Sequence, residues 1–139
     1  MRKTAALLLA VLVFVLCTAG KQKQVDERTR VYLHGGHCDV PTGAVVESSL
    51  RDSIRSSGGY ALADEEEAGA FLISLACVNV GEGWAAVGYH YGLIVGAKPE
   101  KLGNALWNPT LGVFSVGPDG AQRKGRELFA KFDNDVHRQ

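Results

Sequence analysis

Catalytic signature motifs are missing from this 139-residue sequence. It holds no G-x-S-x-G turn, no Walker phosphate loop and no H-E-x-x-H helix, and GEGWAAVG at residues 81–88 has the wrong spacing for a dinucleotide fingerprint. Every serine also falls in a segment with an ordinary structural role. The sequence therefore predicts no cofactor and favours a protein that is not an enzyme.

The sequence also lacks an excess of charge of either sign. Lys and Arg together number 15, as do Asp and Glu, and no basic stripe indicates nucleic-acid binding. The chain is 46% hydrophobic with charges scattered along it, which is typical of a globular domain rather than a disordered one.

Apolar runs long enough to cross a bilayer are absent. The chain opens with a short basic stretch, an apolar run over residues 5–16 and small residues ending at Ala19 and Gly20. This run is shorter than the roughly 20 residues that a membrane-spanning helix needs, and its layout is that of a secretory signal peptide. We therefore expect export to the periplasm or the extracellular space, with no transmembrane span after processing.

Three segments follow from this interpretation: a signal peptide over 1–19, a polar lead-in over 20–29 and a single domain over 30–139. Two alternatives remain open. The apolar run can stay uncleaved as an anchor, or Cys17 can become a lipidated N-terminus, although Leu16 precedes it where lipoproteins usually have a small residue.

Cysteine is scarce, and only Cys38 and Cys77 survive removal of the signal peptide. An even number of cysteines in an exported chain predicts a disulfide. Cys77 shares a strand face with Ile73 and Leu75 and so points into the core, while Cys38 follows the first apolar stretch. We expect their bond to pin the start of the domain to its central strand.

The segment HGGHC at residues 34–38 invites a metal-site interpretation as well. His34 and His37 form one pair of possible ligands, with His90 as the other central histidine. A structural zinc site needs four ligands, usually as two clusters, and no second cluster is present in the sequence. We therefore interpret HGGHC as a glycine-loosened turn that carries one end of the disulfide.

The order of hydrophobic patterns predicts the fold class. The chain is expected to be α+β, with an antiparallel or mixed sheet of about four to five strands and two helices packed on one face. In outline this resembles the small α/β domains of bacterial envelope proteins. The expected strands are 30–34, 60–63, 70–80, 84–97 and 111–116; the first helix covers about 43–57 and the second closes the chain, with 121–123 alternatively extending a hairpin.

Two connections are also predicted. Four adjacent carboxylates at residues 64–67 are expected to form a solvated turn, because neighbouring side chains cannot all converge on one cation. Residues 97–109, which contain two prolines, are expected to form a loop.

The strand predicted over 84–97 is unusual because one of its faces is almost bare backbone. Val87, Tyr89 and Tyr91 lie on the core side, whereas the other side carries glycines around one histidine. A strand with so little side-chain volume usually lets something approach closely. We predict a shallow groove there, with a tryptophan at its edge, formed by Trp84, Gly88, His90, Gly92, Gly96 and Trp107.

The same glycine face has a structural alternative, in which a helix or loop of this chain packs on it. Functionally, the groove favours an exported, non-catalytic binding module of the bacterial cell envelope, with an envelope protein or another envelope component as partner. The second hypothesis is a small-ligand or metal-binding periplasmic protein that uses His90 with His34 or His37. The second hypothesis requires those histidines to be close in space, and the first does not.

The signal-peptide interpretation predicts that protein isolated from its native host begins at Gly20. Intact-mass spectrometry measures this directly, because cleavage after Ala19 removes 19 residues. Retention of Met1, or a lipid-modified Cys17, would contradict it.

Overall fold

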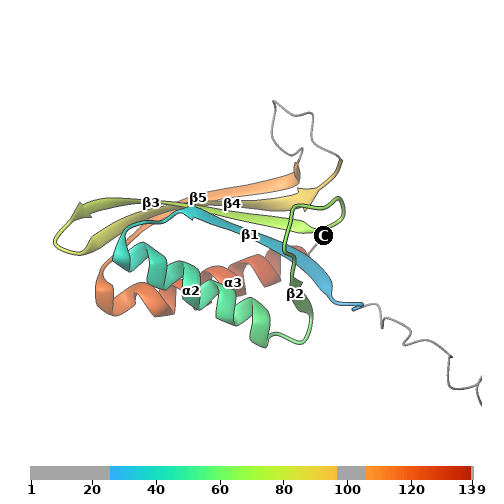
Figure 1. Ribbon diagram of the computed structural model, residues 1–139, viewed down its shortest axis with the longest axis horizontal. Coiled ribbons are helices and arrows are strands. Elements are labelled where there is room, and N and C mark those ends of the chain that lie inside the picture. Colours follow the sequence, from blue (N-terminus) through green and yellow to red (C-terminus); the bar gives the residue numbers. More distant parts are fainter. Residues whose placement is uncertain (1–25, 97–105, 139) are drawn as a thin grey trace, which may run out of the picture.

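Five strands form one mixed sheet, and two helices lie together along one side of it (Figure 1). The computed structural model describes residues 26–96 and 106–138, so the predicted signal peptide, Cys17 and the cleavage site lie outside the described residues. The elements are β1 (Thr29–His37), α2 (Pro41–Ser56), β2 (Tyr60–Leu62), β3 (Phe71–Gly81), β4 (Trp84–Ile94), β5 (Leu106–Val116), a 3₁₀ turn (Pro118–Gly120) and α3 (Ala121–Val136). The predicted α+β class is confirmed.

The sheet order is β2-β1-β3-β4-β5. β1 runs parallel to both β2 and β3, because α2 carries the chain back along the sheet before β2 and residues 63–70 carry it back again before β3. The pairs β3–β4 and β4–β5 are antiparallel. β3 and β4 form a hairpin, and its turn places Gly81, Glu82 and Gly83 at positive φ.

The main core lies between the sheet and the two helices, and a smaller cluster of Ala70, Leu72 and Ile94 is buried on the opposite side of the sheet. Val46, Leu50 and Ile54 recur every four residues along α2 and are fully buried, as the sequence spacing predicts. The Phe132 ring of α3 meets the Phe71 and Tyr91 rings of the sheet edge-on, with centroids 5.5 and 5.4 Å apart. Apolar burial from both helices therefore covers the same side of the sheet.

The two helices pack closely because α3 has a glycine at the contact. A Cβ placed on Gly125 would lie within 3 Å of the backbone of Val46 and Leu50 in α2. Gly125 lies inside α3, which begins at Ala121. Residues 121–123 are thus helical, and the alternative in which they extend a hairpin is wrong. The helix forms there because Leu128 and Phe132 can then reach the core from successive turns.

Two tyrosines tie α3 to the sheet through hydrogen bonds. The Tyr60 hydroxyl donates to Asp133 over 2.8 Å, and the Tyr91 hydroxyl donates to Asp135 over 2.5 Å. Burial, together with the bond to Asp135, raises the pKa of Tyr91 to about 12. The bonds from Tyr91 and Lys131 lower the pKa of Asp135. Both partners are thus held in the protonation states that favour the contact.

The HGGH segment is strand rather than turn, which corrects the prediction. β1 continues to His37 and pairs with β3, with one extra residue in β1 between His34 and His37. The Glu47 carboxylate of α2 occupies the space that a side chain at position 35 would need. The absence of a side chain at Gly35 therefore allows α2 to pack closely on β1. The backbone turns only at the end, where the Cys38 N–H donates to the Gly35 carbonyl.

The segment 97–109 is not wholly a loop. Residues 97–105 lie outside the described part of the chain, but residues 106–109 belong to β5. Asn108 has a φ of 51°, and the register between β4 and β5 shifts at this point, which makes a bulge. Pro109 is tolerated because β5 is an edge strand and needs hydrogen bonds on one side only.

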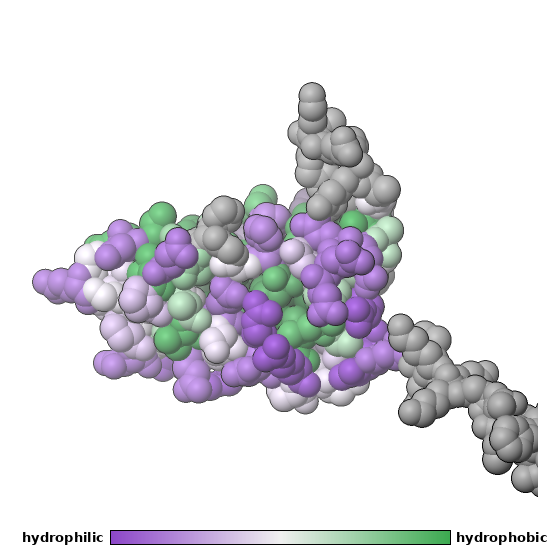
Figure 2. Space-filling view, viewed as in Figure 1, coloured by the Kyte–Doolittle hydropathy of each residue, from purple (hydrophilic) through white to green (hydrophobic). Residues whose placement is uncertain are grey.

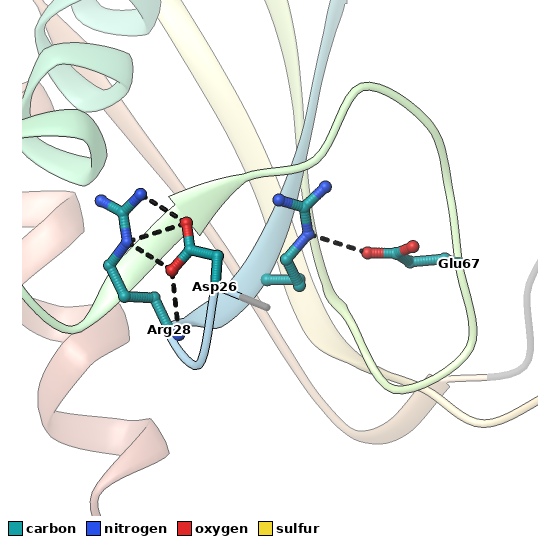
Figure 3. A network of polar contacts seen from close by, with 4 residues as sticks. Asp26, Arg28 and Glu67 are labelled. Carbon is teal, nitrogen blue, oxygen red and sulfur yellow. Dashed lines mark hydrogen bonds and ion pairs between the residues drawn. The ribbon is translucent and has the colours of Figure 1, made fainter. Parts of the chain in front are cut away.

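Polar contacts surround the start of β1 (Figure 3). Arg28 forms an ion pair with Asp26 over 2.6 Å, and Arg30 reaches Glu67 over 3.0 Å. Glu67 belongs to the acidic connection between β2 and β3, where Asp64 and Glu65 are exposed. Exposed pairs of this kind contribute little stability, and the connection is a solvated turn as predicted.

The predicted disulfide between Cys38 and Cys77 is confirmed, with Cα atoms 4.6 Å apart. It joins the residue after β1 to β3, and Cys38 is buried. A Cβ on Gly43 would lie 2.6 Å from the Cys77 sulfur, so the first turn of α2 packs directly on the bond. The disulfide is consistent with an exported protein.

Reduction of the Cys38–Cys77 bond should lower the free energy of unfolding by about 4 kcal/mol, because the bond closes a loop of 39 residues. Urea unfolding monitored by circular dichroism, with and without reductant, measures the difference. The Cys38→Ala/Cys77→Ala double variant provides the control, since its midpoint should not respond to reductant. A midpoint of the native protein that reductant leaves unchanged would contradict this role.

Candidate functional site

The side of the sheet opposite the helices forms the open face, defined here by the side chains of β3, β4 and β5 that point away from α2 and α3. Alternation along β4 places Val87 and Tyr91 in the core and Gly88 and His90 on the open face. In Figure 2 green, hydrophobic residues are interspersed with hydrophilic ones along the upper, sheet side of the molecule, while the lower margin, on the helix side, is largely hydrophilic. Large aliphatic side chains on the open face that are more than half exposed include Val78, Leu111 and Val113.

Strand pairing sets the residues of the open face in rows. Ser74 of β3, His90 of β4 and Leu111 of β5 form one row. Ala76, Gly88 and Val113 form the next. In the second row Val113 of β5 stands beside Gly88 and Ala76, which leaves the middle of the face low at that point.

A shallow hollow of about 540 Å³ lies over these two rows, and we call it the glycine hollow. Its floor is bare at Gly88, where the nearest atom to an added Cβ is the Ala76 carbonyl oxygen, 3.8 Å away. His90 provides an imidazole beside this floor. Its lining comprises Ser74, Ala76, Gly88, Tyr89, His90, Leu111, Gly112 and Val113.

The chemistry of the glycine hollow suits recognition of an apolar group. Most lining groups are aliphatic or backbone, and the polar side chains that the open face offers here are those of Ser74 and His90. Such a site can receive an apolar side chain and make one or two orienting hydrogen bonds. Ser74 and His90 are cross-strand partners, but the row that holds them contains no carboxylate to orient the imidazole as in a catalytic triad.

Gly92 and Gly96 do not line the glycine hollow. A Cβ on Gly92 would lie 3.1 Å from the Leu106 Cβ and from the Trp107 carbonyl oxygen, so the bulged part of β5 covers this glycine. At Gly92 the structural alternative therefore applies, because the chain packs on itself. Gly96 follows the end of β4 at a φ of 152°, a conformation that side chains rarely adopt.

The two tryptophans stand apart from the glycine hollow. Trp84 begins β4 at the hairpin end, and its ring packs near Gly117, where an added Cβ would meet it at 3.0 Å. Trp107 pairs with Leu93, whose side chain belongs to the same side of β4 as Tyr91, so Trp107 does not rise from the open face. Both rings are about half exposed or more.

The structure brings His34 and His90 into one row. His34 pairs with Ser74, and Ser74 pairs with His90, so the two histidines flank one serine on the open face. With strands about 4.8 Å apart, their Cα atoms are about 10 Å apart. The side chain of His37 lies outside the described residues. Within the described ranges, no group of three or more His, Cys, Asp or Glu side chains could hold a metal.

Sequence reasoning did not place Leu111 and Val113 in the site. They form its outer wall and are 77% and 76% exposed. Their alternation with Gly112 and Phe114 was readable in the sequence. What identifies the exposed side is the pairing of Leu111 and Val113 with His90 and Gly88 on the face away from the helices, which periodicity does not reveal.

Comparison with known proteins assigns this chain to no family. No protein-family model matches the chain, and no curated protein matches it. Among solved structures the chain is similar to a single-substitution variant of PelC, a dodecamer from Paraburkholderia phytofirmans. The identity is 19%, the match covers 76% of this chain and 82% of that one, and the TM-score is 0.41. A likeness at this level supports no argument about the fold or the function of this chain. Among the described residues, no helix is long and apolar enough to span a membrane.

The same substitution at the two glycines of β4 should change the free energy of unfolding by different amounts. Gly92→Val should destabilise the domain by about 1–3 kcal/mol, because its side chain would overlap the covering part of β5. Gly88→Val adds its side chain to open space and should leave the free energy of unfolding within about 0.5 kcal/mol. Urea unfolding of the oxidised variants measures both. Equal destabilisation by the two variants would mean that Gly88 is also covered.

Proposed function

We propose that this chain is an exported, non-catalytic binding module of the bacterial cell envelope that holds a protein partner on its open face. The partner would place an apolar side chain in the glycine hollow and accept a hydrogen bond from His90. The observation that carries the proposal is the glycine hollow itself, a depression walled by the exposed Leu111 and Val113.

Three further features support this function. Contiguous exposed apolar surface on a soluble domain commonly marks an interaction site, and here it coincides with the hollow. The disulfide fits a protein that works in an oxidising compartment such as the periplasm. A non-catalytic role agrees with the row of His90, which pairs the imidazole with a serine but with no carboxylate.

A second candidate function is the binding of a metal or small ligand through His34 and His90. The observation in its favour is their placement in one row on either side of Ser74. Two imidazoles are fewer than the three protein ligands of an ordinary zinc site, so the ligand or solvent would complete the coordination. This candidate predicts that His90→Ala abolishes binding of added Zn²⁺, measured by titration calorimetry.

The binding function predicts that Gly88→Val disrupts partner capture without unfolding the domain. Mature oxidised protein is immobilised and exposed to envelope extract of the native host, and the retained proteins are quantified by mass spectrometry. Gly88→Val should lower recovery of a specific partner at least tenfold, because its side chain fills the hollow.

Gly58→Val is the matched control, since Gly58 also has open space around it and lies between α2 and β2, away from the open face. It should retain the partner. Partner recovery that is equal for Gly88→Val and Gly58→Val would rule out the glycine hollow as the binding site. Loss of Zn²⁺ binding in His90→Ala with protein capture intact would favour the second candidate.

A further inference from the structure

The two edges of the sheet are unequal. One edge is β2, which has three residues and is followed by the acidic connection at residues 64–67. Short strands and nearby charge are the usual means by which proteins prevent edge pairing. The other edge is β5, with 11 residues.

Only the first part of β5 is protected against pairing with a further strand. Its first part has the bulge at Asn108 and the proline at position 109, both of which interrupt pairing with a further strand. From Thr110 to Val116 the sequence TLGVFSV holds neither a charged residue nor a proline. Within the described residues, β4 is the sole strand paired with β5, so the outer backbone groups of this segment have no strand partner.

We propose that the segment Thr110–Val116 pairs in antiparallel fashion with the same segment of a second copy of this chain. The chemistry of the edge specifies this partner. A row of unpaired N–H and C=O groups is complemented by another strand, and a segment without charge meets no repulsion from an identical one. Closed two-fold pairing also gives each copy the same contact, as in most homodimers.

Side-chain size selects the register with Val113 on the two-fold axis. Gly112 then lies opposite Phe114 of the second copy, and Leu111 lies opposite Ser115 of the second copy. Each of these pairs sets a small residue against a large one. On the helix side, the Tyr89 ring lies over Gly112 with its centroid 6.1 Å from that of Phe114. An incoming Phe114 would extend this aromatic cluster.

This register also keeps the open faces of both copies on the same side. Residues opposite each other in an antiparallel pair point to one face, and Val113 points to the open face in each copy. Leu111 and Val113 of the two copies then form one apolar strip between two glycine hollows. The dimer would therefore present two adjacent binding sites.

A charged side chain on the axis tests the proposal. Sedimentation velocity of the full mature, oxidised protein over a range of concentrations should show a dimer for the native sequence. Val113→Lys should raise the dissociation constant at least tenfold, because two ammonium groups would face each other on the axis. Val78→Lys is the matched control, since Val78 is also exposed on the open face but belongs to β3, which β4 separates from β5. It should leave the dimer intact.

Cross-linking distinguishes this interface from any other self-contact. Val113→Cys should form an intermolecular disulfide on mild oxidation, since opposite Cβ atoms of a strand pair lie about 4.5–5.5 Å apart. Val78→Cys should not. A native protein that stays monomeric at its highest soluble concentration, or a dimer that survives Val113→Lys, would overturn the proposal. Gly88→Val should leave the dimer unchanged, so failure of the binding function and failure of the dimer are separable.

Discussion

Burial of the helix side of the sheet beneath α2 and α3 is the constraint on which the other features depend. Because side chains alternate along a strand, a shift of one residue in β4 would move Val87 and Tyr91 out to solvent and bury Gly88 and His90. The cost of exposing those core residues sets the register of β4 against its neighbours. The glycine hollow is thus a consequence of core packing on the opposite side of the same strand.

The disulfide and the bulge in β1 allow α2 to pack closely over the end of β1. β1 must remain paired with β3 while α2 crosses close over it, and Gly35 and Gly43 leave the room for that crossing. Gly43 packs against the Cys77 sulfur, so the bond, the end of β1 and the start of α2 form one unit. The glycines of HGGHC therefore serve the packing of the helix on the strand.

Glycine has several distinct roles in this chain, and they are separated by what lies next to each residue. Gly125 brings the two helices together, Gly92 lies beneath the bulged part of β5, and Gly112 lies beneath the Tyr89 ring. Gly88 alone among the glycines of β4 faces open space within a hollow. An isolated glycine in a strand indicates close approach. It does not indicate whether the approaching group belongs to the same chain.

Local patterns in the sequence determined most of the elements and the pairing of the cysteines. Apolar spacing in α2, alternation in β3 and β4 and the glycine-rich hairpin turn act over a few residues, so they can be read without knowledge of the rest of the fold. The sequence likewise determined that β4 has one nearly bare face. Tertiary structure decided that HGGH stays extended beside β3, that residues 106–109 join β5 and that Gly92 is covered. It also decided that His34 and His90 share a row and that Leu111 and Val113 wall the hollow. These outcomes depend on strand order and on contacts between residues distant in the chain, and periodicity carries no information about which strands become neighbours.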